Sequence, residues 1–172
     1  SLIKKKYSAQ LGANPACPTA MAVMAFDPDA WSEYFKFAFV RNPFDFEVSD
    51  YFWRTKGLRN PIEFKEFLRR KLNSNRRDPE EVVPFPATNW PIYTVDDEVA
   101  VDFVGRFEDI ENEVICIGDR IGLPLDINEI PRAKSEHRKS TNPVELYDEE
   151  SKEMVFLMHK NEIDWFGYNY PY

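Results

Sequence analysis

The sequence is poor in the residues that staple small domains or bind metals. It contains two cysteines, Cys17 and Cys116, which cannot build a disulfide framework, and no Cys and His spacing indicates a zinc site. No window of about 18 apolar residues exists, so neither a membrane-spanning segment nor a signal peptide is expected. We therefore expect a cytoplasmic chain without a metal centre. Cys116 lies among Val114, Ile115 and Ile117, which predicts a place in the core.

The charge balance excludes further classes of protein. The formal net charge of −8 argues against a general binder of nucleic acid or of anionic membranes, which needs a basic surface. Apolar residues make up 43% of the chain and aromatic residues 15%, too much for a disordered protein. We expect a single domain over residues 1–172, in which the basic runs 4–6, 69–71 and 76–77 are solvated surface.

A strand-to-helix junction is the most informative local pattern. Aromatic and β-branched residues dominate 34–40 and predict a buried strand, and Pro43 suits the first position of a helix capped by Asn42. Arg41 then stands at the carboxyl end of a strand beside free backbone N–H groups, where open α/β sheets bind anions. Ser49, two turns further on, offers a hydroxyl donor to the same anion.

This junction resembles the 3′-phosphate-binding motif of the carbohydrate-type sulfotransferases, in which Arg-Asn-Pro is followed by Ser and Tyr. These enzymes use 3′-phosphoadenosine-5′-phosphosulfate (PAPS) as donor. The resemblance implies that Arg41 and Ser49 hold the 3′-phosphate of the nucleotide. Residues 101–110 with 121–124, and residues 160–168, are similar to two further blocks of the family.

The resemblance implies an α/β, P-loop-like sulfotransferase fold, with a parallel sheet flanked by helices. In the family, an N-terminal β-loop-α unit with a lysine holds the 5′-phosphosulfate. The 40 residues before Arg41 contain no such unit, so the domain is expected to be truncated at its N-terminus relative to the family. An uncovered sheet edge would favour a homodimer or a partner. Phe46 stands where the family has a second arginine, and Cys17-Pro18 aligns with a Lys-His element.

A second basic segment, residues 132–140, lies late in the chain. A solvated loop is one interpretation. The other is a flap whose Arg138, Lys139 and Ser140 close over the 3′-phosphate, as basic loops do in related sulfotransferases. His137 lies in the same loop and is the candidate catalytic base. His159, the other histidine, falls on an expected helix and is predicted to be structural.

Three functions remain open on the sequence. The first is transfer of a sulfuryl group from PAPS to a carbohydrate or similar hydroxyl, leaving 3′,5′-adenosine bisphosphate. The second is a degenerate member that binds a nucleotide or sugar phosphate without catalysis, and the third is an interaction scaffold. The missing loop and the replaced residues favour the last two, whereas Arg41 and Ser49 favour retained anion binding.

The sequence also predicts the other elements. Helices are expected near 19–25, over 43–53, from Pro61 through Leu72, over 107–121 with Gly122 as the stop, and over 148–165. Apolar stripes on three of them are expected to face the core: Phe44, Val48, Tyr51 and Phe52; Phe64, Phe67, Leu68 and Leu72; and Met154, Val155, Leu157, Met158 and Trp165.

Residues 27–29 suggest a turn, residues 78–91 an irregular excursion, and residues 92–95 and 99–104 a hairpin. The Gly-Arg-Phe-Glu segment suggests either an ion pair between Arg106 and Glu108 that fixes the strand-to-helix turn or direct contact of these residues with a ligand.

Overall fold

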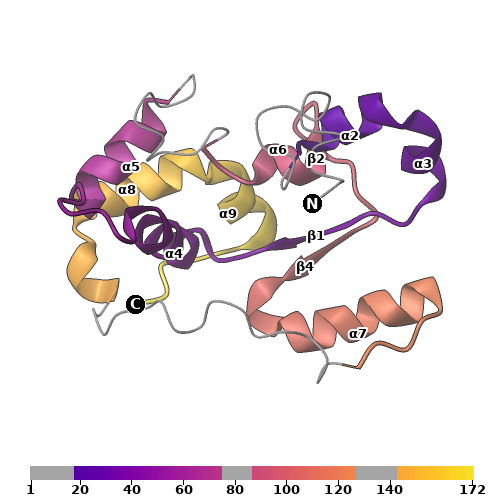
Figure 1. Ribbon diagram of the computed structural model, residues 1–172. Helices are drawn as coiled ribbons and strands as arrows, with labels where there is room; N and C mark the ends of the chain where they lie inside the picture. Colours follow the sequence, from indigo (N-terminus) through magenta and orange to yellow (C-terminus); the bar gives the residue numbers. More distant parts are fainter. Residues whose placement is uncertain (1–17, 75–86, 127–142) are drawn as a thin grey trace. The chain divides into compact units, whose positions relative to one another are not determined.

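The computed structural model describes residues 18–74, 87–126 and 143–172 (Figure 1). The chain divides into two compact units, one within Ser1–Val40 and Asn89–Ile127, the other within Arg41–Thr88 and Asn128–Tyr172. We call the first unit 1 and the second unit 2. The expectation of a single domain over residues 1–172 stays a prediction.

Unit 1 contains a small parallel sheet. Strand β1 (Phe37–Val40) pairs with β4 (Phe103–Arg106) in a register that sets Phe37 opposite Phe103 and Val40 opposite Arg106 (Figure 1). At the start of the ladder, the backbone N–H of Lys36 donates to the Asp102 carboxylate at 2.7 Å. The expected mixture of helices with a parallel sheet is confirmed, although β1 begins at Phe37, three residues later than predicted.

Helix α7 lies close to β4. After the 3₁₀ turn η1 (Phe107–Asp109), α7 (Ile110–Ile121) ends at Gly122, whose φ of 70° is the left-handed conformation that glycine adopts at little cost. The helix and its stop are therefore confirmed. A Cβ on Gly105 of β4 would lie 3.1 Å from the Cβ of Glu113, so the absence of a side chain permits this close approach. The backbone N–H of Arg106 donates to the Glu113 carboxylate, and the Arg106–Glu108 ion pair stays a prediction.

The prediction that Cys116 is buried is wrong, because its side chain is exposed. Residues 114–117 are all apolar, and consecutive residues point to different sides of a helix, so they cannot all face the core. Of its neighbours, Ile117 is 2% exposed, whereas Ile115 is 41% exposed and faces outward with Cys116. Helical periodicity thus divides the run between two faces of α7.

The rest of unit 1 consists of short elements. They are α2 (Ala20–Phe26), α3 (Pro28–Glu33), α6 (Trp90–Tyr93), β2 (Thr94–Val95) and β3 (Glu98–Val99). The expected helix near residue 19 is confirmed, with the Thr19 hydroxyl as its cap. The expected turn at 27–29 is instead the start of α3, because the Asp27 carboxylate accepts from the backbone of Ala30 and Pro28 takes the first position.

The hairpin is confirmed in a shorter form. Strands β2 and β3 pair antiparallel across Asp96 and Asp97, which both have positive φ, as the tightest hairpin turns require. The residues before β2 form α6, because Pro91 fits the first turn of a helix. The residues expected to extend the second strand instead enter β4, which pairs in parallel with β1. The described part of the predicted excursion, residues 87–91, therefore ends in a helix.

Unit 2 is helical in its described part. Its elements are α4 (Pro43–Thr55), α5 (Phe64–Leu72), the 3₁₀ turn η4 (Pro143–Leu146), α8 (Glu149–Met158) and α9 (Lys160–Phe166). Helix α8 packs against both α4 and α5. The apolar positions that face one another have little exposure, and they include Phe44, Val48, Phe64, Phe67, Leu68, Met154, Val155 and Ile163. The stripes predicted for α4 and α5 supply most of this core.

Two boundaries of unit 2 differ from prediction. Helix α5 begins at Phe64, since Glu63 is still extended, rather than at Pro61. The long C-terminal helix is interrupted at His159, whose φ of −111° and ψ of 22° are not helical. Because the break changes the direction of the residues after it, Trp165 is 62% exposed and not buried as expected. Leu157, also expected inside, is 54% exposed.

Gly118 allows a specific test of the α7 packing. A Cβ at this position would lie 2.6 Å from the backbone oxygen of Leu123, which folds back over the end of the helix. Helix propensity alone predicts that Gly118→Ala stabilises the protein by about 1 kcal/mol. We expect the opposite, a loss of about 1–3 kcal/mol in the free energy of unfolding, because backbone must shift.

The measurement is urea unfolding of Gly118→Ala beside Cys116→Ala, a control at an exposed position of the same helix. The control should stay within about 0.5 kcal/mol of the unsubstituted chain. An unchanged or increased stability of Gly118→Ala would show that Leu123 does not pack there.

Candidate functional site

The start of α4 has the local structure that the sequence predicts. The Asn42 side chain accepts a hydrogen bond from the backbone N–H of Phe44 at 3.1 Å, and Pro43 occupies the first turn. The amide of Asn42 also donates to the backbone oxygen of Asn169, near the C-terminus. The first backbone N–H groups of a helix carry partial positive charge, so this end of α4 favours an anion.

Asp45 and Ser49 are four residues apart and so lie along one side of α4, whereas Arg41 precedes the helix and its cap Asn42. The Arg41 guanidinium forms an ion pair with the Asp45 carboxylate, and both side chains are about one-fifth exposed. Ser49 lies one turn beyond Asp45, a rise of roughly 6 Å. The structure thus sets the Arg41 side chain against Asp45 in the first turn of α4, and Ser49 follows one turn later. Sequence analysis did not consider the Asp45 carboxylate.

The other predicted site residues fall outside the described part of the chain. His137, Arg138, Lys139 and Ser140 lie within 127–142, and the Cys17 position lies within 1–17. The flap and the catalytic base therefore stay predictions.

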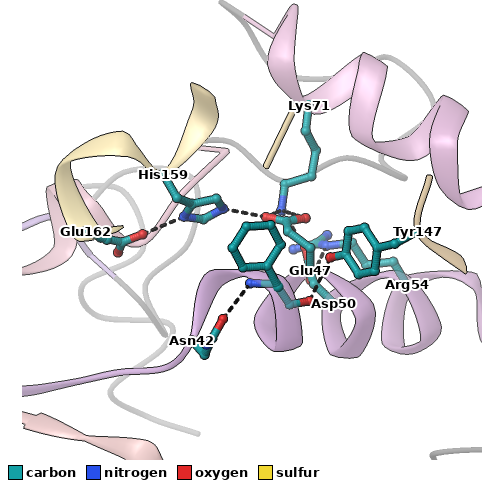
Figure 2. A network of polar contacts seen from close by, with 9 residues as sticks. Asn42, Glu47, Asp50, Arg54, Lys71, Tyr147, His159 and Glu162 are labelled. Carbon is teal, nitrogen blue, oxygen red and sulfur yellow. Dashed lines mark hydrogen bonds and ion pairs between the residues drawn. The ribbon is translucent and has the colours of Figure 1, made fainter. Parts of the chain in front are cut away.

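The inner side of α4 carries a buried ion pair. Glu47 has no exposed surface and Lys71 of α5 is 1% exposed, and the Lys71 ammonium lies 2.7 Å from each oxygen of the Glu47 carboxylate (Figure 2). Lys71 also contacts Asp50 at 3.1 Å. Lys71 was expected on a solvated surface with Arg69 and Arg70. That prediction is wrong for Lys71 but fits its neighbours, which pair with the exposed Glu66.

His159 connects this ion pair to the C-terminal helices. Its Nε2 lies 2.7 Å from the Glu47 carboxylate, and its Nδ1 is in hydrogen-bond contact with the Glu162 carboxylate of α9 (Figure 2). Phe46, which replaces the arginine expected from the resemblance, packs its ring on His159 at 5.9 Å between centroids. The prediction that His159 is structural agrees with this placement, because both ring nitrogens are occupied and the side chain is buried.

The cluster is electrically balanced when His159 is protonated. It then combines three carboxylates, Glu47, Asp50 and Glu162, with three cations, Lys71, His159 and Arg54, the last held by Asp50 at 2.7 Å. Each ring nitrogen of His159 faces a carboxylate, and only the protonated imidazolium has an N–H donor on both nitrogens. We call these six residues the buried ionic cluster.

Two pKa values respond to this arrangement. Burial works to raise the pKa of Glu47, but Lys71 and His159 together outweigh burial and lower it from its usual 4.5. Burial works to lower the pKa of His159, but its hydrogen bonds to Glu162 and Glu47 outweigh burial and raise it above 6.5. Both shifts favour the charged forms, and the enclosed His159 is not expected to act as a general base because carboxylates contact both of its ring nitrogens.

Sequence analysis missed the buried ionic cluster, although a signal was present. Glu47 lies within the apolar stripe of Phe44 and Val48, and Lys71 follows Phe67 by one helical turn. A charge on the apolar face of each helix, opposite in sign, indicates a buried pair. Nothing in the pattern identifies the third partner, because His159 is 112 residues from Glu47.

Comparisons with known proteins agree with the motifs. A family model described as the sulfotransferase family matches residues 19–169. An uncharacterised protein of Archaeoglobus fulgidus is 30% identical over 112 residues, which are 62% of this chain and 84% of that protein. The search of solved structures returned no significant match. Across the described ranges, no helix combines the length and the apolar character needed to span a membrane.

Breaking the Glu47–Lys71 pair should be costly. Lys71→Met removes the cation that faces both oxygens of Glu47, so we expect the free energy of unfolding to fall by about 3 kcal/mol or more. The neighbouring Arg70→Met is the matched control, since Arg70 pairs with the exposed Glu66 and should contribute less than about 1 kcal/mol. Denaturant unfolding measures both. Equal losses in the two variants would contradict the buried pair.

The raised pKa of His159 predicts a pH dependence of stability. A group with a raised pKa in the folded state contributes its full stability below its unfolded value, 6.5, and loses it as the pH rises through the folded pKa. We therefore expect the free energy of unfolding to decline above pH 6.5, and the decline to be absent in His159→Asn.

Histidine ring signals in NMR test the same point without unfolding. The chain has two histidines, and one of them should titrate above 6.5. Titration of both at or below that value would contradict the raised pKa of His159 inside the cluster.

Proposed function

Because the chain belongs to the sulfotransferase family, we propose that it transfers a sulfuryl group from PAPS to a hydroxyl of a carbohydrate or similar acceptor. The acceptor oxygen forms a bond to sulfur while the bond between sulfur and the 5′-phosphate oxygen breaks. The acceptor's proton passes to a base, and 3′,5′-adenosine bisphosphate leaves. We also propose a P-loop-like fold, in which β1 and β4 belong to the parallel sheet.

The observation that supports the proposal best is the position of Arg41 at the start of α4, where its guanidinium contacts Asp45, one helical turn before Ser49. The guanidinium supplies a charge-assisted hydrogen bond, Ser49 supplies a neutral donor, and the helix N-terminus adds partial positive charge. A 3′-phosphate needs such donors because it carries up to two negative charges. In a chain of net charge −8, such a local site is needed to bind a multiply charged nucleotide.

Three residues outside the described ranges complete the proposed site. Arg138 and Lys139 would close over the 3′-phosphate and offset charge on the donor, and His137 would take the proton of the acceptor. A second copy of the chain is the proposed partner that would cover an open sheet edge.

A second function deserves a test because of Phe46. Its ring packs on His159, and the Lys71 ammonium lies 5.2 Å from its centre, so this position serves the buried ionic cluster rather than a ligand. A site with one arginine fewer than the family has can bind a nucleotide or sugar phosphate without catalysing transfer. Incubation with labelled PAPS and an acceptor library separates the two functions, since only an enzyme moves the label.

Titration calorimetry with 3′,5′-adenosine bisphosphate tests the anion site. Arg41→Ala should weaken binding by about 1.5–3 kcal/mol, because it removes a hydrogen bond between charged groups, and should leave folding unchanged. The matched control is Arg59→Ala, an exposed arginine of the same unit, which should bind as the unsubstituted chain does.

The nucleotide 5′-AMP serves as the second control, since it lacks the 3′-phosphate. Equal affinities for the two nucleotides, or full binding by Arg41→Ala, would rule out the assignment of Arg41 to the 3′-phosphate.

A further inference from the structure

A carboxylate already occupies the arginine that is proposed to bind phosphate. Both Nε and Nη2 of Arg41 contact a single oxygen, Oδ2, of Asp45. These two nitrogens form one edge of the guanidinium fork, and such an edge is what a phosphate or carboxylate grips most strongly. Asp45 therefore holds, in the protein without ligand, a binding edge that an incoming anion also needs.

The second oxygen of Asp45 has a partner of its own. The Tyr172 hydroxyl donates to Oδ1 at 2.7 Å. Tyr172 belongs to the C-terminal segment 168–172, which makes several contacts with the start of α4. The Tyr170 ring packs on Phe44 at 5.3 Å and on Tyr172 at 5.5 Å, and Asn42 donates to the backbone of Asn169 at 2.9 Å.

Resting on the proposed function, we infer that Asp45 is an internal competitor for the Arg41 guanidinium and that Tyr172 moderates this competition. A carboxylate beside a bound phosphate repels it, and it must give up the guanidinium edge before the phosphate can take it. The hydroxyl of Tyr172 stabilises Asp45 through Oδ1, away from Arg41, so less negative charge is directed at the arginine and at the anion. The C-terminal segment thereby sets the affinity for the donor.

The opposite role, in which Asp45 merely positions Arg41, predicts a different sign. A positioning carboxylate that is lost leaves the arginine less well oriented, so Asp45→Asn would bind the nucleotide more weakly. A competing carboxylate that is neutralised frees the arginine, so Asp45→Asn would bind more tightly. Asparagine keeps the size of the side chain and an oxygen acceptor, which confines the change to charge.

The experiment is titration calorimetry of four proteins with 3′,5′-adenosine bisphosphate and with 5′-AMP. Asp45→Asn should bind the bisphosphate about fivefold to thirtyfold more tightly, as expected for removing one charge next to a phosphate near the surface. Tyr172→Phe should bind it about three- to fivefold more weakly, because Asp45 loses its other donor. In the double variant Asp45→Asn, Tyr172→Phe, the second change should have no further effect, since the competing charge is gone.

Asp164→Asn is the matched control. Asp164 also pairs with a cation four residues away, Lys160, and both side chains are exposed on α9 of the same unit, so the variant has the same net charge as Asp45→Asn. An equal gain in Asp164→Asn would attribute the effect to net charge and overturn the inference.

The remaining outcomes separate the inference from the proposed function. Binding that depends on Arg41 and on the 3′-phosphate, but is unchanged or weakened in Asp45→Asn, would overturn the inference alone. A loss in both single variants would identify a structural or positioning role. The absence of any binding that depends on the 3′-phosphate, in all four proteins, would overturn the proposed function and the inference together.

Discussion

Unit 2 depends on the ionic contacts of the Glu47 carboxylate, which is enclosed between Lys71 and His159 (Figure 2). The carboxylate joins α4 to α5 and to the junction of α8 with α9, which are far apart in the sequence. Water does not reach these charges, so each compensates another, and the loss of one leaves its partner buried without compensation. Phe67 packs beside this cluster, with its ring centre 5.3 Å from the Lys71 ammonium. We expect the ionic contacts to help specify which helices meet, because they pair particular residues.

This anchoring has a consequence for the opposite side of α4. The inner side is fixed by Glu47 and Asp50, whereas Asp45 and Ser49 lie on another side of the helix, and Arg41 contacts Asp45 from just before its start. A rigid helix positions such groups better than a loop does, which suits the recognition of a phosphate. The fixed N-terminus of α4 also receives the C-terminal segment, through Asn42 and Asp45. The buried ionic cluster, the proposed anion site and the C-terminal segment thus all involve α4.

Local patterns predicted the elements whose causes are local. Asn42 and Pro43 mark the start of α4, Gly122 marks the end of α7, and both boundaries hold because capping depends on neighbouring residues only. The motif around Arg41 indicated the family because it, too, consists of residues that lie close together in the sequence. Two failures involve long-range partners. Lys71 looked like part of a surface run, since its partner Glu47 is 24 residues away, and the His159 side chain, at the helix break, contacts Glu47 from 112 residues away. Cys116 was misplaced because an apolar run of that length cannot all face one side of a helix.

The most direct measurement is a crystal structure of the chain with 3′,5′-adenosine bisphosphate. The account predicts the 3′-phosphate within hydrogen-bond distance of both the Arg41 guanidinium and the Ser49 hydroxyl, with Asp45 withdrawn from the edge of Arg41 and the buried ionic cluster unchanged. A nucleotide bound elsewhere, or a 3′-phosphate without contact to Arg41, would contradict it.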